Sequence, residues 1–147
     1  MIVRREVTLP AAPDEIWRLV SDPGRLPAWW PGVVRVEDTS AEAWTTVFSS
    51  PKGKPVRADY TLVEATPGRI VWRQEVEESP FERILAAATT TIEVGEADGG
   101  SRVTIELDQR PRGWARFAPF QFRAAGVRQV QGALDGLTGL FGAGEDN

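Results

Sequence analysis

Residues 11–33, AAPDEIWRLVSDPGRLPAWWPGV, carry the clearest start and stop signals for secondary structure in the chain. Pro13 occupies the position favoured for a first helical residue, and the two acidic residues after it suit the positive end of a helix dipole. Asp22 is a good N-cap for a second helical start. The Pro-Gly pair at 31–32 ends that second segment. The stretch therefore predicts two short helices in succession.

On both sides of this stretch, apolar and polar residues alternate with the period of a β-strand. One strand is expected before it, over residues 2–10. Six more are expected after it, over residues 33–37, 43–49, 56–65, 69–78, 82–95 and 101–110. The alternation is clean in the last of these, which is typical of an antiparallel sheet with one covered face and one solvated face.

The C-terminal part of the chain changes to a period of three and four, which predicts one long helix over residues 115–141. The expected apolar stripe comprises Phe117, Phe120, Ala124, Val127, Val130, Leu134, Leu137 and Phe141. Glycines at 132, 136 and 139 either let this helix pack closely or let its far end fray. Residues 142–147 are expected to be a disordered tail. The helical stripe and the apolar sheet face must cover each other, so the fold class is α+β.

Composition narrows the function. The 147 residues suit a single domain over 1–147, and the net charge of −4 argues against a nucleic-acid partner. The chain has neither His nor Cys, which excludes histidine catalysis, thiolate chemistry and the usual zinc sites. We therefore expect no metal and no cofactor. Because no apolar run approaches the roughly 20 residues of a membrane span, we expect a cytoplasmic protein.

Three spaced elements of the opening stretch resemble the START/Bet v 1-like (SRPBCC) superfamily, and most of all its polyketide cyclase/dehydrase-like branch of small bacterial proteins. They are AAPDEIW at 11–17, VSDP at 20–23 and LPAWWPGV at 26–33. The resemblance implies the helix-grip fold, a curved antiparallel sheet of about seven strands wrapped on a long C-terminal helix around a cavity. It carries over no catalytic residue, because the family has no universal one.

The strand at 82–95 is unusually rich in small residues. If Ile92 faces the helix, then Ala86, Ala88 and Thr90 face it too, and their small side chains leave room for a ligand. The alternative is that a bulky aromatic side chain from the helix fills this space.

Two polar residues stand on apolar strand faces. Tyr60, the only tyrosine, either finds one hydrogen-bond partner and has no further role, or orients a ligand carbonyl, or, as a weaker candidate, acts as a general acid. Gln74 needs a hydrogen-bond partner if buried and is the other weak catalytic candidate. The expected ligand-binding residues are therefore Tyr60, Trp72, Gln74, Ala86, Ala88, Thr90, Phe120 and Val127.

The residues leave three functions open. The first is binding of a small hydrophobic or aromatic ligand between the sheet and the C-terminal helix. The second is a cofactor-free enzyme of the polyketide cyclase, aromatase or dehydratase type, and the third is a chaperone- or ribosome-associated interaction module. Either a monomer or a homodimer fits the sequence.

Three arginines cluster just before the long helix, namely Arg110, Arg112 and Arg116. They form either a solvated face or a site for an anion.

Overall fold

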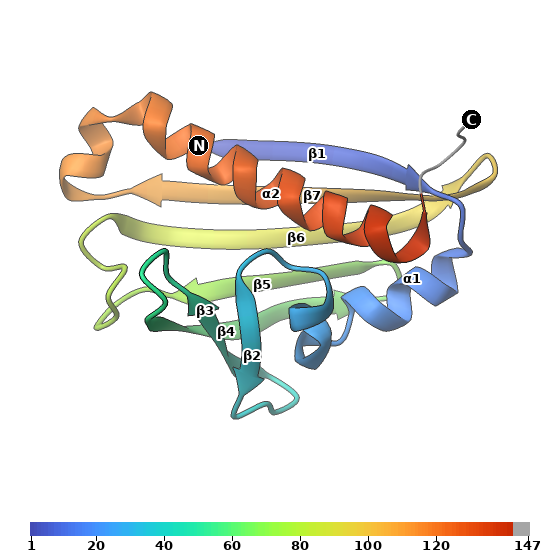
Figure 1. The fold of residues 1–147 in the computed structure, drawn as a ribbon, viewed down its shortest axis with the longest axis horizontal. Helices are drawn as coiled ribbons and strands as arrows, with labels where there is room; N and C mark the ends of the chain where they lie inside the picture. The colour runs from blue at the N-terminus through green and yellow to red at the C-terminus, as the bar shows by residue number, and fades with distance from the viewer. Residues whose placement is uncertain (143–147) are drawn as a thin grey trace.

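A computed structural model describes residues 1–142, and it consists of a curved sheet packed against one long helix (Figure 1). The elements in chain order are β1 (Ile2–Leu9), α1 (Pro13–Val20), η1 (Pro23–Ala28), β2 (Val33–Glu37), β3 (Ala43–Ser49), β4 (Pro55–Thr66), β5 (Arg69–Glu75), β6 (Leu85–Ala97), β7 (Gly100–Pro111), η2 (Gly113–Phe117) and α2 (Pro119–Phe141). The predicted helix-grip fold is confirmed. All but the first residue of the expected disordered tail lies outside the described residues.

The seven strands form one antiparallel sheet in the order β1-β7-β6-β5-β4-β3-β2. Strands β2, β4 and β6 each contain a register shift, and such bulges bend the strand and increase its twist. The sheet therefore curves, and α2 lies across its concave side (Figure 1). The helix makes most of its contacts with the sheet on β1 and β7, and η1 packs on β2 at the other edge.

The two short helices begin as the sequence predicts. Pro13 is the first residue of α1, and Ile16, Leu19 and Val20 on one side of that helix are buried. The Asp22 carboxylate accepts a hydrogen bond of 3.0 Å from the backbone N–H of Gly24 and so caps η1. These two helices close one end of the space between the curved sheet and α2.

Glycines in the C-terminal half of α2 allow an unusually close approach to the segment after η1. A methyl group built on Gly136 would overlap the backbone carbonyl oxygen of Trp29, and one on Gly132 would lie 3.0 Å from the Pro31 ring. Trp29 and Trp30 are both buried beneath this contact. For Gly132 and Gly136 the structure therefore supports close packing, with this segment as the partner, whereas Gly139 has no neighbour within 4 Å of its would-be Cβ.

The predicted helix over 115–141 is wrong in its first part. The chain forms η2, breaks at Ala118 with an extended φ of −129°, and starts α2 at Pro119. A residue before proline is pushed out of the helical region, which explains the break. Phe117 and Phe120 are consequently not buried and are 79% and 86% exposed.

The buried stripe of α2 also differs from the expected one in its first half. It comprises Gly126, Val130, Ala133, Leu134 and Leu137. Ala124, which the sequence placed on the stripe, is exposed. Gly126 faces the sheet, but a glycine does not register as apolar in the helical periodicity. The apolar pattern therefore gave the wrong helix face around this residue.

The close packing at Gly136 gives a test with a matched control. We expect Gly136→Ala to lower the free energy of unfolding by about 1–3 kcal/mol, because the new methyl group overlaps backbone that cannot move freely. Gly139 has nothing within 4 Å of its would-be Cβ, so Gly139→Ala should raise stability by about 0.5–1 kcal/mol through helix propensity alone. Chemical denaturation of the two variants measures both values, and equal effects would contradict the packing described.

Candidate functional site

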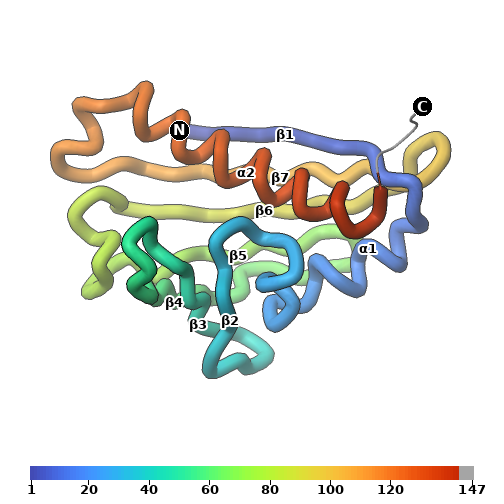
Figure 2. Tube along the Cα trace, in the orientation of Figure 1, coloured from blue at the N-terminus to red at the C-terminus, as the bar shows by residue number. Residues whose placement is uncertain are grey.

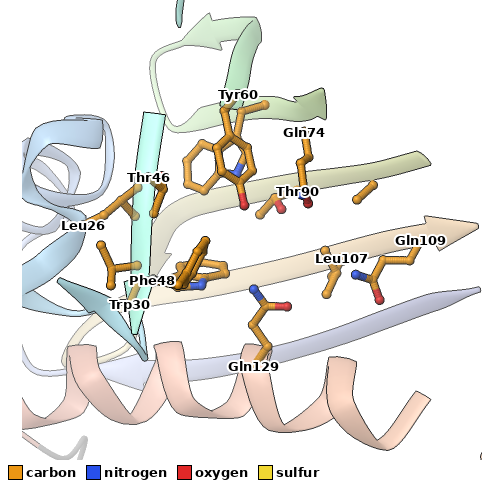
Figure 3. Close-up of a pocket in the computed structure, with 13 residues that line it drawn as sticks. Leu26, Trp30, Thr46, Phe48, Tyr60, Gln74, Thr90, Leu107, Gln109 and Gln129 are labelled. Carbon is orange, nitrogen blue, oxygen red and sulfur yellow. The ribbon is translucent and has the colours of Figure 1, made fainter. Parts of the chain in front are cut away.

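A cavity lies between the concave face of the sheet and α2 (Figure 3). It has a narrow inner end of about 20 Å³ and an outer cleft of about 410 Å³ that opens to solvent. Five residues line both parts and so join them, namely Phe48, Tyr60, Gln74, Gln109 and Gln129.

The outer cleft is mostly apolar. The turn between β3 and β4, the connection between β5 and β6, and the first half of α2 form its walls. Its apolar lining residues are Phe48, Pro51, Val56, Phe81, Ile84, Leu85, Phe122 and Ala125. A cleft of this size and lining is typical of small-molecule sites.

The inner end is polar. Tyr60 and Gln74 are directly opposite each other on β4 and β5, and Thr46 and Thr90 also line this end. In Figure 3 the side chains of Tyr60 and Gln74 point from the sheet toward α2, and Gln129 points from α2 toward them. The inner end thus gathers hydroxyl and amide groups from both walls of the cavity.

Two of these polar atoms are buried without a partner. Neither Nε2 of Gln74 nor Oγ1 of Thr46 has a hydrogen-bond partner within residues 1–142. An unpaired buried polar group costs about 1–3 kcal/mol. No hydrogen bond joins Gln74 Nε2 to Tyr60, so the amide of Gln74 and the hydroxyl of Thr46 are free to bind something else.

Burial raises the pKa of the Tyr60 hydroxyl well above its ordinary value of 10.0. The phenol therefore stays protonated at neutral pH and can donate a hydrogen bond. Its ring stacks on Trp44, with ring centroids 5.8 Å apart and an angle of 13° between the planes. This stacking fixes the direction in which the hydroxyl points.

A line of aromatic rings extends from Tyr60 to Trp29, whose backbone contacts the C-terminal half of α2. Trp44 meets Trp72 edge-on at 5.6 Å, Trp72 meets Trp30 at 6.0 Å, and Trp30 meets Trp29 at 5.3 Å. Edge-to-face pairs of this kind add to the stability gained from burial. This line of rings makes the wall behind the cavity rigid.

The cavity lining contains no Asp, Glu, Lys or Arg. A further hollow beside α1, of about 510 Å³, is by contrast bordered by Asp14 and Glu96. No group of three or more acidic side chains that could hold a metal ion occurs in residues 1–142. Across the same residues, none of the helices is long and apolar enough to cross a membrane.

Comparison with known proteins identifies the family. The sequence profile described as "Polyketide cyclase / dehydrase and lipid transport" matches residues 1–142. The chain belongs to this family. A search of curated proteins found no match.

Solved structures share the fold of this family member at low sequence identity. A START superfamily protein from Mycobacterium smegmatis has a TM-score of 0.75 at 13% identity, covering 95% of this chain and 96% of that one. A protein from Thermobifida fusca has a TM-score of 0.70 at 22% identity, covering 96% and 93%. The di-domain ARO/CYC protein StfQ of the steffimycin biosynthetic pathway has a TM-score of 0.76 at 14% identity, covering 95% of this chain and 50% of StfQ.

Five of the eight residues proposed from the sequence lie together in the cavity of this polyketide cyclase/dehydrase family member. They are Tyr60, Trp72, Gln74, Ala88 and Thr90. The other three lie elsewhere. Ala86 sits in the β6 bulge, which breaks the alternation so that Leu85 faces the cleft instead. Phe120 points into solvent, and Val127 packs on the core beside the cavity without lining it.

Sequence reasoning missed the polar residues contributed by β3, β7 and α2. Gln109 continues the inward alternation of Val103, Ile105 and Leu107, and this alternation was the available signal. Gln129 lies outside the apolar stripe expected from the sequence, but it is half-buried and lines the cavity. The inward orientation of Gln129 follows only from the finding that Gly126, three residues earlier, faces the sheet.

Because Tyr60 is the only tyrosine, its ionisation can be followed by the near-ultraviolet absorbance of tyrosinate. The folded pKa lies above the unfolded one, so this group does not alter stability below pH about 10 and lowers it as the pH rises further. We expect no tyrosinate in the folded protein at the pH where a free tyrosine is half ionised, and a transition that coincides with unfolding. Tyr60→Phe should show no transition, and ionisation of the wild type near pH 10 without unfolding would contradict the burial.

Proposed function

We propose that this protein binds a small, mostly apolar molecule that carries one neutral hydrogen-bonding group and enters the cavity with that group first. The observation that carries the proposal is the pairing of an open apolar cleft with an inner end where buried polar atoms lack partners. Membership of a family described by cyclase, dehydrase and lipid-transport functions supports a ligand of this kind.

The two parts of the cavity correspond to the two parts of such a ligand. The outer cleft of about 410 Å³ suits a ring system or a short chain. At the inner end, the amide nitrogen of Gln74 and the hydroxyl of Tyr60 can both donate to a carbonyl or hydroxyl oxygen. A ligand oxygen there would satisfy an atom that is otherwise buried and unpaired.

The ligand group should be neutral. A charge placed in the cavity would lose its hydration, and no charged side chain lines the cavity to compensate for that loss. This argument disfavours fatty-acid carboxylates and phosphates at the inner end and favours ketones, esters, phenols and alcohols.

Binding is better supported than catalysis. General acid–base work is most efficient when the catalytic pKa lies near the working pH, and burial moves the pKa of Tyr60 further away from neutrality. The Gln74 side-chain amide neither gains nor loses a proton near neutral pH. Both weak catalytic candidates are therefore better suited to hydrogen bonding than to proton transfer.

A pair of ligands of nearly equal shape tests the inner end. We expect acetylnaphthalene to displace the neutral fluorophore N-phenylnaphthylamine about tenfold better than ethylnaphthalene does, because its carbonyl gains a hydrogen bond that the hydrocarbon cannot form. Gln74→Leu should remove most of this preference and leave ethylnaphthalene affinity nearly unchanged. Gln74→Leu should also be at least as stable as the wild type, since it deletes a buried unpaired amide. A wild type that binds neither compound, or a preference that survives in Gln74→Leu, would refute the proposal.

Two neighbouring alanines test the outer cleft. Ala125 lines the cleft and Ala124 does not, although both are exposed on α2. Ala125→Trp should lower N-phenylnaphthylamine affinity by about tenfold or more by filling the cleft, while Ala124→Trp should leave it unchanged. Equal loss in both variants would show that the fluorophore binds elsewhere.

A further inference from the structure

The segment between β7 and the first turns of α2 exposes three aromatic side chains within seven residues. Trp114, Phe117 and Phe120 are 69%, 79% and 86% exposed and are the most exposed large hydrophobic residues in the described chain. Single apolar residues on a surface are ordinary, but a cluster of three aromatic rings is not. An exposed aromatic cluster of this kind indicates a binding partner that itself presents apolar surface.

The same segment concentrates positive charge on an acidic protein. Residues 109–134 contain five arginines and no acidic residue, whereas the rest of the chain has 12 basic residues against 21 acidic ones. The first turn of α2 contains no Asp or Glu either, although the helix dipole would favour one there. Positive charge is thus concentrated in this stretch of the sequence.

None of these five arginines belongs to an ion pair in the described part of the chain. Arg112 and Arg123 donate hydrogen bonds to backbone carbonyl oxygens, of Glu82 and Ile2. The Arg116 guanidinium lies over the Phe117 ring, 5.4 Å from its centroid. Their charge is therefore available to a negatively charged partner.

The exposed rings lie next to the cavity. A hollow of about 190 Å³ is lined by Trp114, Ala115 and Ala118 on one side, and shares Ile84, Phe122 and Ala125 with the outer cleft. Figure 2 shows this segment, in orange, looping out at the same end of the molecule as the connection between β5 and β6 that borders the cleft. Of the three exposed rings, Trp114 therefore lines a hollow that adjoins the outer cleft.

We propose that residues 110–123 dock the protein on an anionic lipid surface, with the mouth of the cleft facing the bilayer. Aromatic rings favour the interface between headgroups and hydrocarbon, and arginines are attracted by anionic headgroups. A second copy of this chain is a poorer occupant, because twofold pairing of this surface would bring the arginines of both copies together. Membrane docking is a separate property from ligand binding in the cavity, and it can be measured in the absence of a cavity ligand.

Flotation of the purified full chain with lipid vesicles tests this proposal. We expect binding to vesicles of equal parts phosphatidylglycerol and phosphatidylcholine, weakening as salt is raised, and little binding to phosphatidylcholine alone. Phe117→Ser combined with Phe120→Ser should weaken binding about tenfold or more. The matched control combines Val34→Ser with Val63→Ser, at positions 52% and 53% exposed but outside the segment, and should bind as the wild type does.

The charge component has its own control. Arg110→Gln with Arg116→Gln should weaken binding to the anionic vesicles by about 30-fold, and Arg18→Gln with Arg25→Gln, at exposed positions elsewhere, should not. Wild-type protein that fails to float, or binding that is lost equally in the control variants, overturns the proposal. So does a dimer that becomes monomeric with the two serine substitutions and never floats. Retained N-phenylnaphthylamine binding in the serine variants separates failure of docking from failure of the cavity.

Discussion

The contact between the backbones of α2 and the segment after η1 sets the shape of the whole molecule. It depends on the absence of a side chain at Gly136, which lets the helix lie directly on the carbonyl of Trp29. This fixes the C-terminal half of α2 low over the sheet, where Val130, Leu134 and Leu137 fill the space completely. In the N-terminal half, Gly126 lies against Val3 of β1 and Leu107 of β7. The outer cleft lies beside this half of the helix and is closed on its other side by the turn between β3 and β4 and the connection between β5 and β6.

The inner end of the cavity carries a cost in stability. An apolar residue at position 74 or 46 would avoid a buried polar atom without a partner, and the proposed ligand contact would offset that cost. Functional sites commonly break rules that the rest of a protein obeys. The aromatic rings packed behind Tyr60 complement this arrangement, because their stacked and edge-to-face contacts hold the Tyr60 ring in position.

The sequence was sufficient for the fold, since proline and aspartate at the helix starts and strict alternation in the strands are local signals. It was also sufficient for Tyr60, Gln74 and Thr90, because each is a polar residue on an inward strand face. It failed where geometry depends on distant parts of the chain. The bulge that turns Ala86 away, and the rotation of α2 that turns Gln129 inward, are set by tertiary packing. Periodicity cannot reveal a helix face that meets its partner through glycine.

The line of rings from Tyr60 to Trp29 has an optical consequence. Neighbouring centroids lie 5.3–6.0 Å apart, close enough for excitation absorbed by any ring to migrate along the line. One end of this line reaches the polar floor of the cavity and the other reaches the carbonyl on which α2 rests. The emission of these four tryptophans should therefore respond both to changes at the floor of the cavity and to changes in the packing of α2 on Trp29.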